Sequence, residues 1–157
     1  MAKLEWTKKF DTGIEVIDSQ HKRIMNYINQ LEDLRIVHPL RPDPEVGRVI
    51  GELVDYTMSH FAFEESLMDE AGYEFLIAHK TVHTNFTLRI DEFHDRYKNG
   101  ENIAHELHAL LVSWLVNHII TDDANYAPTV TQFLEKREKA KNSGWIATKL
   151  RGFFGAK

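Results

Sequence analysis

Apolar side chains recur every three or four residues over four long stretches of the chain, which is the spacing of an amphipathic α-helix. These stretches cover about residues 18–36, 44–71, 75–98 and 103–121. Short connections rich in proline, glycine and asparagine separate them, and the sequence shows no strict alternation typical of a half-buried β-strand. The pattern therefore predicts an all-α protein that folds as an up-down four-helix bundle.

Residues typical of helix ends support these boundaries. Asp18 or Ser19 can cap the first helix, and Pro44 suits the first position of the second. Gly72 follows the second helix at the position that a left-handed residue usually takes, and Gly100 follows the third. The helices are therefore expected to be joined by short turns.

The two ends of the chain add segments outside the helical core. Residues 1–16 mix apolar and turn-forming residues and are expected to form an irregular N-terminal arm. A short helix is expected over 132–140, so that residues 1–134 form the bundle and residues 135–157 a basic, amphipathic C-terminal extension. Residues 145–154 are basic and aromatic, and two interpretations stay open: they pack on the bundle, or they dock on an anionic membrane surface or a partner protein.

Polar side chains occupy core positions in all four predicted helices. His21 takes the step between Ile17 and Ile24 in the apolar stripe of the first helix. In the second and third helices the polar residues form pairs spaced i, i+4, which places both members of a pair on one face. A buried imidazole or carboxylate without a partner is costly. The set comprises His21, His60, Glu64, His79, His83, His118 and either Asp122 or Asp123.

This set of side chains is larger than a single metal ion needs. A zinc site takes three or four protein ligands, whereas five imidazoles and two carboxylates fit two metal ions that share carboxylates. The chain has no cysteine, so nitrogen and oxygen atoms must supply every ligand. Imidazole combined with carboxylate in a helical bundle favours iron. A single buried histidine is usually bonded to a backbone carbonyl, but this many polar residues at one level of a bundle argue for metal.

Composition limits the other classes of function. The chain has 157 residues, 43% hydrophobic and 27% charged, as expected for one soluble globular domain. Residues 1–130 carry 12 Lys and Arg against 22 Asp and Glu, which argues against nucleic-acid binding, whereas residues 131–157 carry 7 against 2. No apolar run approaches the length of a membrane-spanning helix or resembles a signal peptide, so a cytoplasmic location is expected.

Five sequence blocks together resemble the hemerythrin family, specifically the single-domain bacterial hemerythrins, over about residues 4–134. A lone pair of histidines spaced i, i+4 is a weak signal. The match is specific because all the blocks occur in order and each candidate ligand falls in a core seam. The blocks are Trp6 with residues 14–21, residues 60–65, residues 79–83, residues 114–123 and residues 126–128.

The resemblance implies a non-haem di-iron centre, oxo- or hydroxo-bridged, that binds O2 reversibly. The implied function is O2 storage, delivery or scavenging by a monomer. The alternatives are an O2 or redox sensor module, or a di-iron protein acting on NO or peroxide. No general base or nucleophile stands beside the candidate ligands, so an enzyme is not expected.

The resemblance also assigns the ligands. By position, His79, His83 and His118 would hold one iron, His21 and His60 the other, and Glu64 and Asp123 would bridge both. The iron with fewer imidazoles then lacks a sixth protein ligand, and the resemblance implies that O2 binds there.

The choice between Asp122 and Asp123 rests on the resemblance. On an ideal helix Asp122 shares the face of His118, while Asp123 lies about 140° away. The family pattern places the bridging aspartate five residues after the histidine, so Asp123 is expected to be the ligand. The helix should therefore loosen or end just after His118.

A dry pocket for O2 is expected beside the metal ligands. The resemblance favours Leu115 as one wall, and ordinary core packing is the alternative for every candidate. The candidates lie within a helical turn of the ligands: Phe61, Trp114, Leu115, Ile119 and either Ile24 or Met25.

The remaining polar residues are expected to be less involved. Tyr126 is left open between contacting the ligands and packing only. The carboxylates of Glu65, Asp69 and Glu70 are expected on a solvated face. Four histidines follow no pattern and are expected at the surface or in loops: His38, His94, His105 and His108.

Overall fold

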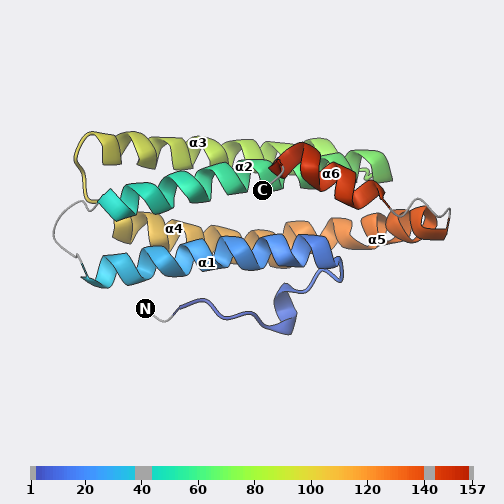
Figure 1. The fold of residues 1–157 in the computed structure, drawn as a ribbon, viewed down its shortest axis with the longest axis horizontal. Helices are drawn as coiled ribbons and strands as arrows, with labels where there is room; N and C mark the ends of the chain where they lie inside the picture. Colours follow the sequence, from blue (N-terminus) through green and yellow to red (C-terminus); the bar gives the residue numbers. More distant parts are fainter. Residues whose placement is uncertain (1–2, 38–43, 140–143, 156–157) are drawn as a thin grey trace.

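The computed structural model describes residues 3–37, 44–139 and 144–155, and it confirms the predicted all-helical bundle. Four long helices lie alongside one another and run alternately up and down (Figure 1). The described ranges contain no strand. The four helices are α1 (Glu15–Val37), α2 (Pro44–Ala71), α3 (Leu76–Lys98) and α4 (Ala104–Asn117).

Helix α2 has the boundaries that the sequence predicts. It begins at Pro44 and ends at Ala71, and Gly72 follows with a φ of 73°. The amide of Gly72 donates to the carbonyl of Asp69 at 3.1 Å, and that of Tyr73 to the carbonyl of Met68 at 2.9 Å. These two hydrogen bonds form a Schellman motif, which explains why a glycine ends the helix.

Helix α1 begins three residues before the predicted cap. Asp18 lies inside the helix, so the prediction that it caps the helix is wrong. Its carboxylate instead accepts hydrogen bonds from the backbone amide of Thr12 at 2.9 Å and from the Thr12 hydroxyl at 2.7 Å. Asp18 therefore fastens the N-terminal arm to α1, a contact that helix-end patterns do not reveal.

The fourth helix does not end near Thr121, as the sequence predicts. After α4 the chain forms a π-helical segment, η2 (His118–Asp123), and continues directly into α5 (Ala124–Lys139). A π-helical turn takes up an extra residue without breaking the backbone hydrogen-bond ladder. The prediction that the helix loosens just after His118 is confirmed. The separate short helix predicted over 132–140 is the end of α5, and its last residue lies outside the described residues.

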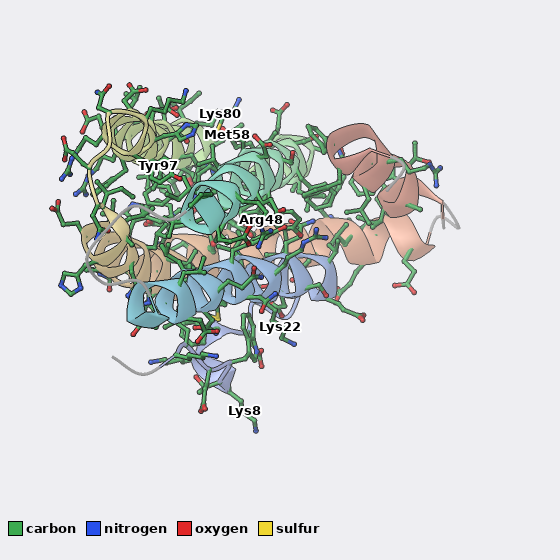
Figure 2. All side chains as sticks on the ribbon, turned by 60° about the vertical axis from the view of Figure 1, so that its left-hand side comes forward. Lys8, Lys22, Arg48, Met58, Lys80 and Tyr97 are labelled. Atoms are coloured by element: carbon green, nitrogen blue, oxygen red, sulfur yellow. The ribbon has the colours of Figure 1, made fainter. Side chains whose placement is uncertain are left out.

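Apolar side chains fill the bundle in two clusters of buried residues. One cluster includes Ile24, Leu53 and Leu111, and Phe10 of the arm packs into it from a short 3₁₀ turn, η1 (Lys8–Phe10). The other includes Phe63 and Tyr126 and lies where the last helix covers α2. At the surface Lys8 and Lys80 project away from the bundle, whereas the ammonium of Lys22 lies over the ring of Trp6 in the arm (Figure 2).

Helix α6 (Trp145–Phe154) packs on the bundle, across α2 (Figure 1). Its apolar side chains contact the cluster around Phe63, and the ring of Phe154 lies 5.2 Å from that of Tyr56. Lys149 donates to the hydroxyl of Ser66, and its ammonium lies 3.3 Å from Glu70. Of the two interpretations of residues 145–154, these contacts support packing on the bundle.

None of the helices in the described ranges is both long enough and apolar enough to cross a membrane.

Candidate metal centre

The structure brings seven of the predicted ligand candidates to one level of the bundle. They come from α1, α2, α3 and η2, and none exposes more than 5% of its surface. The π-helical segment explains the spacing of His118 and Asp123, because its i to i+5 pattern returns Asp123 to the inner face. The seven residues are His21, His60, Glu64, His79, His83, His118 and Asp123.

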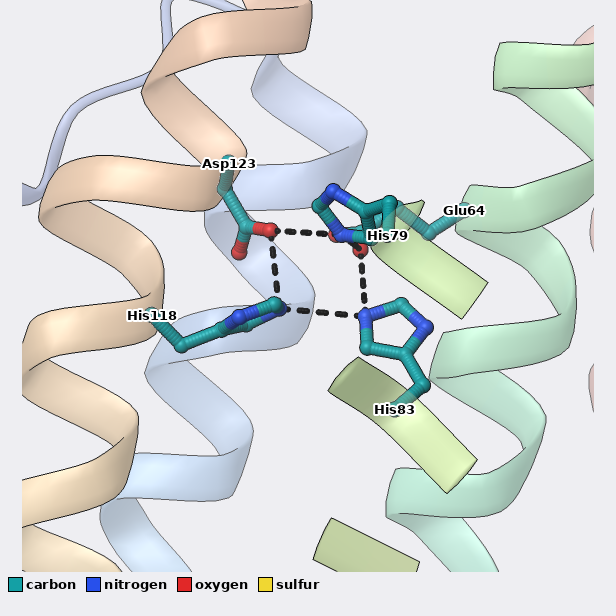
Figure 3. A group of neighbouring side chains, drawn as sticks. All are labelled: Glu64, His79, His83, His118 and Asp123. Atoms are coloured by element: carbon teal, nitrogen blue, oxygen red, sulfur yellow. Dashed lines mark hydrogen bonds and ion pairs between the residues drawn. The ribbon is translucent and has the colours of Figure 1, made fainter. Parts of the chain in front are cut away.

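One group of five ligand atoms surrounds a common point (Figure 3). Glu64 Oε1 lies 3.1 Å from His79 Nε2 and 3.2 Å from His83 Nε2. Asp123 Oδ1 lies 3.0 Å from His118 Nε2 and 3.2 Å from His79 Nε2. The Nε2 atoms of His83 and His118 face each other at 3.0 Å. Five nitrogen and oxygen atoms are thus turned inward from three different segments.

A second group uses the other oxygen of each carboxylate. Glu64 Oε2 lies 3.3 Å from His60 Nε2 and 3.7 Å from His21 Nε2. Asp123 Oδ2 lies 3.1 Å from His21 Nε2. Glu64 and Asp123 therefore each present one oxygen to the first group and the other oxygen to the second, which is the arrangement of a bridging carboxylate. This second group contains two imidazoles, against three in the first.

The spacing of these atoms fits metal coordination. Neighbouring ligands on an octahedral ion at about 2.1 Å lie about 3.0 Å from one another. Most of the contacts above fall between 3.0 and 3.3 Å. Both oxygens of Asp123 are buried, and imidazole nitrogens lie 3.0 to 3.2 Å from them. Buried carboxylate oxygens aimed at imidazole nitrogens in this way suit a pair of cations between them.

Without metal, protons must balance the two carboxylates. Burial lowers the pKa of His21, but hydrogen bonds and charges of Asp123 and Glu64 outweigh it and raise the pKa to about 9. The same competition raises the pKa of His79 to about 10. Burial dominates at His60 and lowers its pKa. Both carboxyl groups keep pKa values below their usual range despite burial, because imidazoles surround them.

The outer nitrogens of three imidazoles have different partners. His60 Nδ1 lies 2.6 Å from Oε1 of Gln20, and His118 Nδ1 lies 2.9 Å from Asp122. His83 Nδ1 lies 3.7 Å from Glu65. When Nε2 binds a metal, Nδ1 keeps its proton and donates a hydrogen bond to such a partner, which fixes the orientation of the ring. Asp122 is thus placed to orient His118 from outside the ligand groups, whereas Asp123 lies inside them.

Two further residues contact the candidate ligands. The hydroxyl of Tyr126 donates to Glu64 Oε2 at 2.8 Å, so this fully buried tyrosine does more than fill space. Gln20 was missed in the sequence because polar residues next to a histidine are common. Its position four residues before Ile24 and seven before Tyr27, both buried, is the signal that could have revealed it.

The predicted pocket residues lie around the histidines. The ring of Phe61 stacks on His83 with centroids 3.7 Å apart, and Trp114 stacks on His118 at 4.4 Å. Leu115 and Ile119 are buried, whereas Trp114 is partly exposed. These side chains exclude water from the ligands; that they form an O2 pocket stays a prediction.

One prediction about a peripheral residue is wrong, and another holds only in part. His108 is fully buried rather than at the surface, and its Nε2 lies 3.6 Å from the buried carboxylate of Glu32. Glu65 is only partly exposed because it faces His83. His105 is exposed and His94 partly exposed. Asp69 and Glu70 are exposed, as predicted, and His38 lies outside the described residues.

Comparison with known proteins gives a consistent result. Residues 12–130 match the model of the hemerythrin HHE cation binding domain. A bacteriohemerythrin of Pseudomonas aeruginosa (strain LESB58) is 46% identical over 156 residues, which is 99% of this chain and all of that protein. A bacteriohemerythrin of Methylococcus capsulatus is 31% identical over 83% of this chain and 99% of its own length.

A solved structure agrees with these matches. The crystal structure of a wild-type hemerythrin superposes with a TM-score of 0.75 at 29% identity, covering 82% of this chain and 98% of that one.

Proposed function

The chain belongs to the hemerythrin family and binds O2 at a di-iron centre, and we propose that this binding is reversible and serves to store, deliver or scavenge O2. The observation that carries the proposal is the unequal division of ligand atoms. Two groups share both carboxylates, but one group has three imidazoles and the other has two. The group with fewer imidazoles leaves room for an external ligand.

We propose the following ligand assignment. When bound, the iron pair supplies the electrons and the coordination position that O2 needs. His79, His83 and His118 would hold one iron, and His21 and His60 the other, with Glu64 and Asp123 shared.

The surrounding residues would favour binding over further reaction. Phe61 and Trp114 cover two of the histidines with apolar rings, which keeps water and nucleophiles away. Tyr126 and Gln20 hold Glu64 and His60 through hydrogen bonds. Family members are oxygen binders, and we propose that this chain likewise does not turn over a substrate. A sensor role, or action on NO or peroxide, is not favoured by any feature of the site.

A cytoplasmic location and a monomeric state stay predictions. So does docking of residues 145–154 on another surface, which would require α6 to leave the contacts that it makes with α2.

Cycles of argon and air test the proposal. The iron-loaded protein should change its optical spectrum in air and return to the starting spectrum under argon, over repeated cycles. Irreversible oxidation in the first cycle, or multiple turnovers of added NO or peroxide at a rate that exceeds oxygenation, would contradict it.

A further inference from the structure

A groove of about 1240 Å³ runs along the side of the bundle where α6 lies beside α1, α2 and α5. The ribbon view shows α6 crossing α2 on this side (Figure 1). The groove is separate from the metal ligands themselves, and the function proposed above leaves it unused.

The floor of the groove reaches the metal centre through one side chain. Gln20 lines the groove, and its Oε1 lies 2.6 Å from Nδ1 of His60. The other end of its amide, Nε2, is buried and has no hydrogen-bond acceptor among the described residues. Gln20 is only 4% exposed, so it separates the groove from His60 and a bulky molecule cannot pass it. Electron transfer from the groove to the metal centre does not require such a passage.

The rim of the groove is acidic. Its lining residues include five carboxylates and two guanidinium groups. One of the five, Glu52, pairs with Arg48 at 2.9 Å, and one guanidinium, of Arg23, lies 4.6 Å from the ring of Tyr56. Four exposed carboxylates remain: Glu15 on α1, Asp55 on α2, and Glu135 and Glu138 on α5. A partner that complements this rim must be cationic.

The walls of the groove are apolar and aromatic. Ile146, Leu150 and Phe154 line it from α6, all partly exposed, and Tyr27 and Tyr56 line it from α1 and α2. An apolar centre inside a charged rim is the usual anatomy of a protein interface. Proteins that exchange electrons typically form small, short-lived interfaces, in which opposite charges bring the two partners together.

We propose that this groove is the docking surface of a cationic one-electron carrier protein, which reduces oxidised iron through Gln20 and His60. The inference rests on the proposed function, because reversible O2 binding requires ferrous iron and oxidised centres must be returned to that state. Each carrier molecule gives up one electron and is itself oxidised, so two carriers restore one pair of ferric ions.

A charge-matched pair of variants tests the proposal. In the groove variant, Asp55→Asn, Glu135→Gln and Glu138→Gln remove three rim charges. In the control variant, Asp91→Asn, Glu92→Gln and Asp95→Asn remove three exposed charges from α3, which does not line the groove. The probe is a reduced, basic c-type cytochrome, mixed with the oxidised iron-loaded full chain at low salt.

Two readouts are compared. The groove variant should lower the second-order rate constant for cytochrome oxidation about tenfold and weaken cytochrome binding, measured by calorimetry, by a similar factor, while the control variant changes either by less than about twofold. Equal effects of the two variants, or no effect of either, would overturn the proposal. The argon and air cycles should be normal in both variants, so failure of docking is distinguishable from failure of O2 binding.

Discussion

The hydroxyl of Tyr126 donates a hydrogen bond to Oε2 of Glu64 at 2.8 Å, although 62 positions separate the two residues. The contact joins α5 to α2, and it exists because the π-helical segment η2 carries the helix past His118 without a break. Burial, together with the nearby charges of Glu64 and Asp123, raises the pKa of Tyr126 well above its ordinary value, so the hydroxyl remains a donor. The carboxylate that we propose to be shared by two ions is thereby held in place by a hydroxyl from outside both ligand groups.

Tyr126→Phe should destabilise the iron-free protein by about 1–3 kcal/mol, because a buried carboxylate loses a hydrogen-bond donor. The measurement is denaturant unfolding after chelation of the metal. Tyr73→Phe is the control, since Tyr73 is only partly buried and also packs near Tyr126. Equal stability of the Tyr126 variant and the parent would show that the hydrogen bond contributes nothing.

Gln20→Ala should weaken binding of one iron by roughly 10- to 100-fold, since His60 loses the acceptor that orients its ring. Gln20→Glu keeps an acceptor at this position and should restore most of the affinity. Iron retained per chain against a graded chelator measures both. Loss of iron in the glutamate variant equal to that in the alanine variant would mean that Gln20 acts only by packing.

Raised histidine pKa values give the iron-free protein a defined pH dependence. The pKa values of His21 and His79 lie at about 9 and about 10, against 6.5 for an ordinary histidine, so the folded state binds more protons than the unfolded state across this interval. Their contribution to stability is therefore complete below pH 6.5 and is lost as the pH rises to about 10. Unfolding free energies measured at several pH values should fall across this range, and a flat or rising profile would contradict the shifts.

The same shifts predict proton release on metal binding. Metal ions must displace the protons of His21 and His79 near pH 7, because both pKa values lie above it. Ferrous iron added to weakly buffered apoprotein should therefore acidify the solution, and an unchanged pH would contradict protonated histidines in the metal-free centre.

Gly47 allows α2 to approach α3 closely. A Cβ atom at this position would lie 2.6 Å from the ring and hydroxyl of Tyr97, whereas a Cβ at Gly51, one turn further along α2, would meet nothing within 4 Å. Gly51→Ala should therefore stabilise the protein by about 0.5–1 kcal/mol through helix propensity. Gly47→Ala should destabilise it by about 1–2 kcal/mol, because overpacking outweighs that gain. Equal thermal stability of the two variants would contradict the close approach.

The sequence is sufficient to predict the helices and the set of ligand candidates, because both depend on local spacing. His60 with Glu64, and His79 with His83, stand in apolar stripes where their polarity is conspicuous. Asp123 is different, because its inward position depends on a π-helical turn that the geometry of an ideal helix does not predict. The choice of Asp123 over Asp122 came from the family resemblance.

Other features depend on contacts between distant residues. The burial of His108 beside Glu32 joins two helices and has no local pattern, so the surface prediction was wrong. The start of α1 was misplaced because Asp18 bonds to the arm rather than capping the helix. The amphipathic pattern of residues 145–154 predicts a helix with an apolar face, but the pattern does not indicate which surface covers that face. In the structure the face packs on α2.

Iron content of the Glu64→Ala variant tests the central claim most directly, because a shared carboxylate serves both ions. The parent chain should retain two irons, and the variant should lose both together as chelator is added, in a single transition. A variant that keeps one tightly bound iron while releasing the other would contradict a centre built on shared carboxylates.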